Sequence, residues 1–260
     1  MKACIVIPLA LMGLFSVGSV YAMTNTQAKQ LAMAAYNGKA TYLAKLESAA
    51  KSGNSAAQYW LGYYWGAKRD YRKANYWYKK AADQGNAKAE YTLGIFYYYG
   101  QGVPQNSKKA DHWFKNAADQ GFAKAENRLG CAYYYGQGVP QNSKKADHWF
   151  KNAADQGYAA SEFNLGLAYA LGSGVPQDYA KANFWFEKAA AQGNTMSEFS
   201  LGNAYYHGHG VPQNTMTAIM WWGKTVAQGG YWGKKAQFNI NLVEPARLDR
   251  IIISDHFWES

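Results

Sequence analysis

Five glycines recur at intervals of 36 residues, each directly after a glutamine that closes a helix-like segment: Gly85, Gly121, Gly157, Gly193 and Gly229. A fixed period of this length is typical of solenoids, in which each repeat packs against its neighbours along the chain. The stretch YYYGQGVPQNSKKADHWFKNAADQG occurs unchanged at 97–121 and at 133–157, so one repeat was duplicated within the gene. These features predict a single array of repeats.

The second half of each repeat has the apolar spacing of a helix that buries one face. After Asn106, apolar residues stand at i, i+3, i+4, i+7 and i+8: Ala110, Trp113, Phe114, Ala117 and Ala118. A residue suited to cap a helix start precedes each of these segments: Asp70, Asn106, Asn142, Asp178 and Asn214. The periodic glycine is expected to end the helix in the left-handed conformation.

The first half of each repeat reads as a second helix with a glycine inside it. Leu93, Gly94 and Tyr97 recur at equivalent positions in the following repeats. Since a glycine inside a helix costs about 1 kcal/mol relative to alanine, its recurrence indicates close packing. We expect Trp113, or its counterpart in another repeat, to be seated against this glycine. The turn Gly100–Pro104 then separates the two helices, because proline cannot extend the first one.

The terminal segments depart from the pattern, as caps of a solenoid do. The first repeat is four residues short, because Gly66–Arg69 replaces the longer turn. Ala236–Val243 is expected to form a lone helix that Pro245 ends, and the remainder either caps the array or docks in its groove. The predicted boundaries are a leader at 1–22, a helical cap at 23–53, repeats at 54–85, 86–121, 122–157, 158–193 and 194–229, and a partial repeat with a cap or tail at 230–260.

Residues 1–22 have the pattern of a secretory signal, with Lys2 before an apolar stretch and Ala22 at the expected cleavage site. The alternative is a retained membrane anchor. Cleavage would leave Cys131 as the only cysteine, which excludes an intramolecular disulfide. It would also change the formal charge from +10 to +9, because Lys2 is lost. We therefore predict a secreted protein, periplasmic or extracellular, with no transmembrane segment after cleavage and a preference for acidic partners or anionic surfaces.

The repeated pattern A-x-x-x-L-G-x-x-Y-x-x-G-x-G-V-P-x-D/N-x-x-K-A-x-x-W-F/Y-x-K-A-A-x-x-G, over about residues 54–229, closely resembles the Sel-one-like repeat, which is related to the tetratricopeptide repeat. The resemblance implies an all-α, right-handed α-solenoid of antiparallel helix pairs. It also implies an adaptor or scaffold that binds a protein or peptide. Secreted bacterial members of this family are often linked to signalling control, envelope assembly or contact with host cells.

The repeat register explains most residues that could suggest chemistry. His207 and His209 could be a metal pair, but His209 occupies the variable position of the Gly-x-Gly turn, and a metal site needs three or four ligands. Ser48 and Lys51 match the S-x-x-K of penicillin-recognising enzymes, but the S-D-N and K-T-G motifs of those enzymes do not occur. A glutamate recurs near each first-helix start, where it opposes the helix dipole: Glu90, Glu126, Glu162 and Glu198. We predict no enzyme activity, no cofactor and no metal.

The predicted binding surface consists of first-helix positions that vary between repeats. First helices line the concave side of such a stack, and residues that the core does not need are free to contact a partner. The alternative is that these are tolerated surface positions. The candidate residues are Trp60, Tyr63, Thr92, Ile95, Tyr99, Arg128, Cys131, Tyr135, Asn164, Leu167, Leu171, Ser200, Asn203 and His207.

A second candidate surface is a ridge of lysines on the second helices, which we call the lysine ridge: Lys108, Lys109, Lys115, Lys144, Lys145 and Lys151. Such a ridge could contact an anionic envelope surface, and the alternative is a solvated face. Nucleic acid is not expected as a partner, because a secreted protein seldom meets it. The leading hypothesis is an adaptor or regulator of the bacterial envelope or the host interface. The competing hypotheses are a penicillin-binding or β-lactamase-like enzyme acting on cell-wall material, and a structural spacer bound to an anionic surface.

Overall fold

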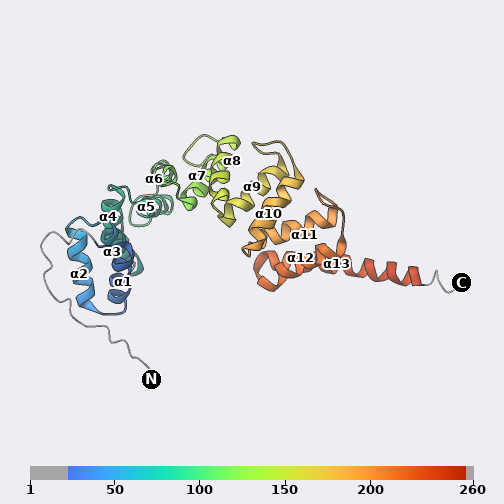
Figure 1. The fold of residues 1–260 in the computed structure, drawn as a ribbon, viewed down its shortest axis with the longest axis horizontal. Helices are drawn as coiled ribbons and strands as arrows, with labels where there is room; N and C mark the ends of the chain where they lie inside the picture. Colours follow the sequence, from blue (N-terminus) through green and yellow to red (C-terminus); the bar gives the residue numbers. More distant parts are fainter. Residues whose placement is uncertain (1–22, 256–260) are drawn as a thin grey trace, which may run out of the picture. The chain divides into compact units, whose positions relative to one another are not determined.

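A computed structural model of the chain describes residues 23–255, with side chains described to residue 243, so the predicted leader at 1–22 lies outside the described residues. The described part forms thirteen α-helices and no strand, which confirms the predicted all-α solenoid of helix pairs (Figure 1). The chain divides into two compact units, one ending at Gln105 and one beginning at Asn106.

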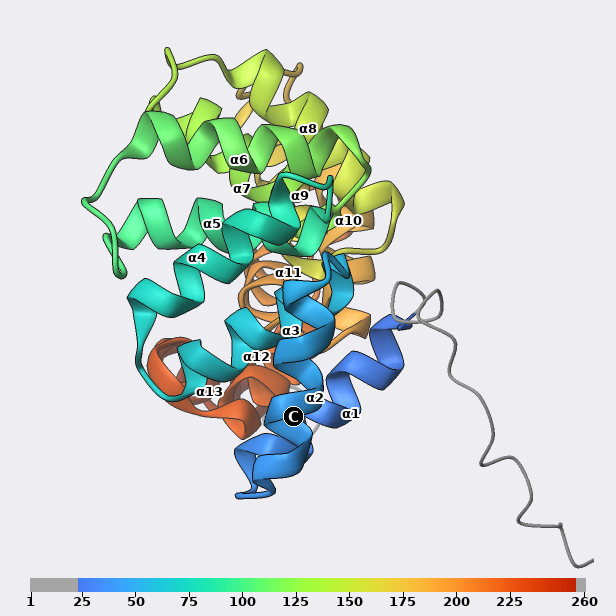
Figure 2. The ribbon, with the colours of Figure 1, turned by 90° about the vertical axis from the view of Figure 1, so that its left-hand side faces the viewer.

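The N-terminal unit contains five helices, in which each second helix packs on the first helix before it and on the one after it. α3 contacts α1, α2 and α4, so it lies at the centre of this unit. Ala28, Leu46 and Leu61 are fully buried in its core. Figure 2 shows the unit from its side, with α1, α2 and α3 in blue. The five helices are α1 (Asn25–Tyr36), α2 (Ala40–Lys51), α3 (Ser55–Ala67), α4 (Tyr71–Ala82) and α5 (Ala87–Tyr99).

The C-terminal unit contains eight helices, each in contact with the next along the chain. Its core is a series of small clusters, one for each junction, as expected when every repeat buries its apolar face against its neighbours. The helices are α6 (Ser107–Asp119), α7 (Ala123–Tyr135), α8 (Ser143–Asp155), α9 (Ala159–Leu171), α10 (Tyr179–Ala191), α11 (Thr195–His207), α12 (Thr215–Gln228) and α13 (Gly230–Asp255).

The predicted helix starts are confirmed. The side chain of Asn106 accepts a hydrogen bond from the backbone N–H three residues later, at 2.9 Å, and the other four predicted caps do the same. The repeat-ending glycines also have positive φ, for example 76° at Gly121 and 78° at Gly157. The helix boundaries are therefore set by local chemistry that recurs with the repeat.

The glycine inside the first helix does have a packing role, but the predicted partner was wrong by one residue. A Cβ built on Gly130 would lie 2.6 Å from two ring atoms of Phe150, and a Cβ on Gly166 would lie 2.7 Å from the ring of Phe186. The neighbouring Trp149 is only half-buried. Both residues lie on the apolar side of the second helix, but the phenylalanine is the one directed at the preceding first helix. At the Trp113 position, Trp149 is half-buried and Trp185 is buried, but the residue after each of them is the one that contacts the glycine.

The recurring glutamates are buried and hydrogen-bonded. Glu162 is 3% exposed and accepts a hydrogen bond from Gln192 Nε2 at 2.8 Å. Gln156 and Gln228 make the same bond to Glu126 and Glu198. These bonds join the start of a first helix to the end of the second helix in the same repeat, so the glutamates are structural in addition to lying near the helix dipole.

The C-terminal segment differs from its prediction. α13 begins at Gly230 and continues through Pro245 to Asp255, whereas a helix ended by Pro245 was expected. Proline removes one backbone donor but does not always end a helix. Among its described side chains, Ala236, Ile240 and Val243 are buried and pack with Trp222 of α12. None of the helices within residues 23–255 combines the length and the apolar character that a bilayer crossing requires.

Candidate partner-binding site

Three pockets follow one another along the first helices of the C-terminal unit, and we call them together the pocket row. Each lies between the first helices of consecutive repeats, and an aromatic side chain of the second helix lies at its back: Phe150, Phe186 or Trp222. Leu167 lines the first and second pockets, and Asn203 lines the second and third. The pockets therefore form a connected series that a single extended ligand could follow.

The first pocket lies between α7 and α9. Cys131 and Tyr135 line one side, and Asn164 and Leu167 line the other. The Asn164 amide nitrogen lies 2.9 Å from Asn127 Oδ1 and 4.0 Å from the Cys131 sulfur. Burial raises the pKa of the Cys131 thiol, so the cysteine is a small apolar wall and not an activated nucleophile.

The second pocket lies between α9 and α11 and has the most polar groups. Ser200 and Asn203 of α11 face Leu167, while Asn183 and His209 complete the wall. The Asn183 amide nitrogen donates to the backbone carbonyl of His209 at 2.7 Å, which fixes the turn at the edge of the pocket. This pocket therefore combines an apolar floor with amide and hydroxyl groups at its rim.

The third pocket lies between α11 and α13 and is bordered by Asn203, His207 and Asn239. Asn239 Nδ2 lies 3.4 Å from Asn203 Oδ1. The rings of His207 and His209 stack with centroids 5.4 Å apart, and His209 also stacks on Tyr179 at 4.7 Å. At least one asparagine therefore lines each of the three pockets.

No carboxylate lines any of the three pockets. The acidic residues of α7, α9 and α11 are the buried glutamates already described, whose carboxylates accept bonds from glutamines of the second helices. Asparagine amides can both donate and accept, as a peptide backbone does. The pocket row can therefore bind an extended segment through its main chain and accept its side chains over the apolar floors.

The predicted binding residues of the C-terminal unit are largely brought together by the fold. Seven of them line the pocket row: Cys131, Tyr135, Asn164, Leu167, Ser200, Asn203 and His207. Arg128 and Leu171 line none of the three pockets, although Leu171 is 60% exposed on the same helix as Leu167. The side chains that sequence reasoning missed are second-helix and turn residues, such as Phe150, Asn183 and His209. Phe150 recurs as a core position and His209 occupies the variable position of a turn, so the repeat pattern did not show that these residues also form pocket walls.

The predicted residues of the N-terminal unit have mixed environments. Tyr63 and Tyr99 are exposed, while Thr92 and Ile95 are half-buried. Trp60 differs from its prediction as a surface residue, because it is buried in the core of this unit and its indole N–H donates to Asn25 Oδ1 at 2.8 Å. The helix α1, which has no counterpart in a regular repeat, covers it.

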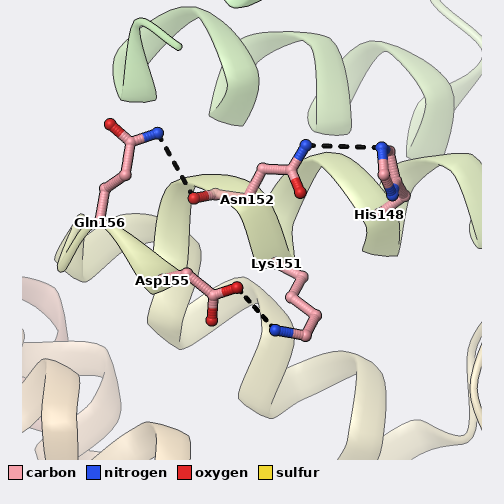
Figure 3. A network of polar contacts seen from close by, with 5 residues as sticks. All are labelled: His148, Lys151, Asn152, Asp155 and Gln156. Atoms are coloured by element: carbon pink, nitrogen blue, oxygen red, sulfur yellow. Dashed lines mark hydrogen bonds and ion pairs between the residues drawn. The ribbon is translucent and has the colours of Figure 1, made fainter.

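The lysine ridge is exposed but partly neutralised. Lys151 Nζ lies 2.6 Å from an Asp155 carboxylate oxygen, as Figure 3 shows, and Lys115 makes the equivalent pair with Asp119. In the same figure Asn152 bonds to the His148 ring, so four polar side chains of α8 form two pairs within the helix. Exposed pairs of this kind contribute at most about 1 kcal/mol each, and they reduce the positive charge available to a partner.

The described residues contain no group of three or more His, Cys, Asp or Glu side chains that could hold a metal ion. His207 and His209 therefore stack without a third ligand of these types. Ser48 and Lys51 lie on the exposed surface of α2, outside the pocket row. Two histidines alone do not supply the three or four ligands that a metal site requires.

Comparison with known proteins gives one family and several similar structures. The Sel1 repeat model matches residues 55–86, 87–122, 123–158, 159–194 and 195–230. A protective antigen of uropathogenic Escherichia coli strains, with an SLR fold, is 39% identical with a TM-score of 0.71; the match covers 72% of this chain and 41% of the antigen. A Sel1 repeat protein from Oxalobacter formigenes is 31% identical with a TM-score of 0.71, and the match covers 78% of this chain and 83% of that protein. A comparison with curated proteins gives no match.

Proposed function

Because the chain belongs to the Sel1 repeat family, whose members are generally scaffolds for protein interactions, we propose that it binds an extended segment of a partner protein in the pocket row. The observation that carries this proposal is the regular series of three pockets, which share Leu167 and Asn203. Apolar floors with a few fixed polar groups are typical of sites that orient a ligand and bury its side chains.

The polarity of the pocket row favours recognition of a main chain. Each pocket is lined by an asparagine, Asn164 in the first, Asn203 in the second and Asn239 in the third, and the neighbouring lining residues are aromatic or aliphatic. An extended segment offers peptide groups at regular intervals and places alternate side chains on one face. The partner segment is therefore expected to be extended, with apolar side chains directed into the pockets.

We further propose that the protein acts outside the cytoplasm, at the bacterial envelope or in contact with a host. The apolar leader predicted at 1–22 supports export. The likeness to a protective antigen supports a role at the host interface, although this chain spans 41% of that protein.

Site-specific photocrosslinking tests the proposed binding. A photoreactive phenylalanine is placed at Tyr135, Leu167 or His207 in the pocket row, and at Lys151 or Glu187 on second helices as matched exposed controls. We expect the same partner to be crosslinked in native envelopes from all three pocket positions and from neither control. Crosslinks that form equally at the controls, or at the controls alone, would refute the pocket row as the binding surface.

The lysine ridge supports a second candidate function, a spacer held on an anionic surface. Lys108 and Lys144 are exposed at equivalent positions of the two duplicated repeats. This candidate predicts association with anionic vesicles that falls steeply as salt is added, because exposed charges are screened. Pocket substitutions would leave that association unchanged.

A further inference from the structure

Two buried aspartates of the duplicated repeats stand apart from the other acidic residues of the C-terminal unit. Asp111 on α6 is 6% exposed, and Asp147 on α8 is 5% exposed. Both oxygens of Asp147, and Oδ2 of Asp111, have no hydrogen-bond partner among the described residues. A buried carboxylate without a partner is costly when it is ionised. These residues therefore need an explanation that repeat packing does not supply.

The equivalent residue of the next repeat shows which hydrogen bond a side chain at this position can make. Asn183 on α10 is equally buried, and its amide nitrogen donates to the backbone carbonyl of His209 at 2.7 Å. His209 lies in the turn of the following repeat, so this bond ties a second helix to the next repeat. Asn75 in the N-terminal unit holds the same slot, but its amide nitrogen has no partner. The bond therefore depends on the geometry of each junction.

The side chain of Asp147 reaches the equivalent turn. A Cβ built on Gly174 would lie 2.1 Å from Asp147 Oδ2, and a Cβ built on Gly138 would lie 2.0 Å from Asp111 Oδ2. The residue that takes the place of His209 is Ser173 in the turn near Asp147 and Gln137 in the turn near Asp111. A carbonyl oxygen only accepts hydrogen bonds, as an ionised carboxylate does, so ionised Asp147 cannot make the bond of Asn183. A protonated carboxyl has an O–H and can make it.

The surroundings favour the protonated form. Burial raises the pKa of Asp111 and of Asp147 to about 6, and no charged group contributes to either shift. The charged residues on the elements packed around Asp111 and Asp147 interact with other groups or are exposed to solvent. Glu126 and Glu162 accept hydrogen bonds from glutamines, Asp178 pairs with Lys181, and Lys115 and Lys151 pair with aspartates. Half-buried Arg128 of α7 acts on the Cys131 thiol, and Lys145 lies over the Tyr133 ring. The remaining charged or titratable side chains are exposed: Lys108, Lys109, His112, Lys124, Lys144 and His148.

We propose that Asp111 and Asp147 bind protons and, when protonated, link one repeat to the next by a hydrogen bond. Each takes up one proton from solvent and then donates its O–H to a carbonyl of the turn in the next repeat, at Gln137 for Asp111 and at Ser173 for Asp147. The hydrogen bonds of Asp111 and Asp147 form as the medium becomes mildly acidic, whereas the hydrogen bond of Asn183 is present at every pH. This inference concerns the coupling of repeats and does not depend on the proposed partner binding.

The sign of the pH dependence follows from the direction of the shift. A folded-state pKa above the unfolded value means that the native protein holds the proton at a pH where the unfolded chain has lost it. The stabilisation is therefore complete below the unfolded pKa and is lost as the pH rises through about 6. Asparagine at both positions supplies an N–H donor without taking up a proton, so Asp111→Asn/Asp147→Asn mimics the protonated aspartates.

Thermal unfolding of the chain from Met23 onward, at about pH 5 and about pH 8, tests the proposal. We expect Asp111→Asn/Asp147→Asn to raise the Tm by roughly 5 °C at the higher pH and by much less at the lower pH. Asp119→Asn/Asp155→Asn, which removes exposed paired aspartates, is the matched control and should show no such gain. The reverse change, Asn183→Asp, should lower the Tm more at the higher pH than at the lower pH.

A direct titration gives a readout that is independent of stability. Carbon-13 NMR of the aspartate carboxyls should show two groups that titrate near pH 6, and both should be missing in Asp111→Asn/Asp147→Asn. Carboxyls that titrate in the ordinary aspartate range would overturn the proposal. So would a Tm difference between the wild type and this variant that is the same at both pH values.

Discussion

The glycine in the middle of each first helix can be tested by adding one methyl group. Gly202 of α11 is buried, and a Cβ built on it would lie 2.3 Å from both Cδ1 and Nε1 of Trp222. Carbon atoms in contact are normally about 3.5–4.0 Å apart. Trp222 is 1% exposed and packs against Ala236, Ile240 and Val243, which hold the indole in place.

Overpacking of a core costs about 1–3 kcal/mol, and the severe overlap at Gly202 places this site at the upper end. Alanine gains about 1 kcal/mol over glycine in a helix. Gly202→Ala should therefore lower the free energy of unfolding by about 1–2 kcal/mol. Gly223 of α12, in the same repeat, is the matched control, because no atom lies within 4 Å of its added Cβ. Gly223→Ala should raise the stability by about 0.5–1 kcal/mol.

Urea unfolding followed by circular dichroism measures both changes. The penalty of Gly202→Ala should also disappear in a Trp222→Ala background, because the two residues are in contact and their effects are coupled. Equal stabilisation by Gly202→Ala and Gly223→Ala would refute the packing role of the glycine. An unchanged penalty in the Trp222→Ala background would refute the identity of its partner.

Three further substitutions test other parts of the fold by urea unfolding. Phe150→Ala should lower the free energy of unfolding by about 3–5 kcal/mol, as emptying a buried aromatic site does. Trp149→Ala should lower it clearly less, because Trp149 is half-exposed, and equal losses would contradict the assigned helix face. Glu162→Gln should keep the bond to Gln192 and raise stability at neutral pH, because burial raises the pKa of Glu162 and its ionised form is the unfavourable one there; the gain should shrink as the pH falls, and a gain that grows instead would contradict this sign. Asn142→Ala removes a helix cap and should cost about 1 kcal/mol, whereas an unchanged midpoint would show that the cap is dispensable.

Features set by local chemistry could be predicted from the sequence. A cap such as Asn142 and an end such as Gly157 act within one turn of helix, so their spacing was enough to place the helices. The choice between Trp149 and Phe150 could not be made in this way. Both are apolar neighbours on one helix, and the direction of the preceding helix decides which of them meets Gly130.

Long-range contacts were the main source of error in the candidate site. Trp60 occupies a stripe position, but α1 covers it, and only the bond to Asn25 reveals this. The pocket walls contributed by Asn183 and His209 also depend on how one repeat meets the next. By contrast, the bond between Glu162 and Gln192 could have been found, because a glutamate and a glutamine recur 30 residues apart in several repeats.

The affinity of a crosslinked partner for two sets of variants tests whether the pocket row binds that partner. Tyr135→Ala/Leu167→Ala/Asn203→Ala changes the pocket row, and Lys108→Glu/Lys109→Glu/Lys144→Glu/Lys145→Glu changes the lysine ridge; unfolding curves of both variants serve as the control for folding. We expect the first set to weaken binding by roughly 30-fold, about 2 kcal/mol, and the second to alter mainly the association rate and its salt dependence. Binding that survives the first set intact and is abolished by the second would contradict the claim and assign the partner to the ridge.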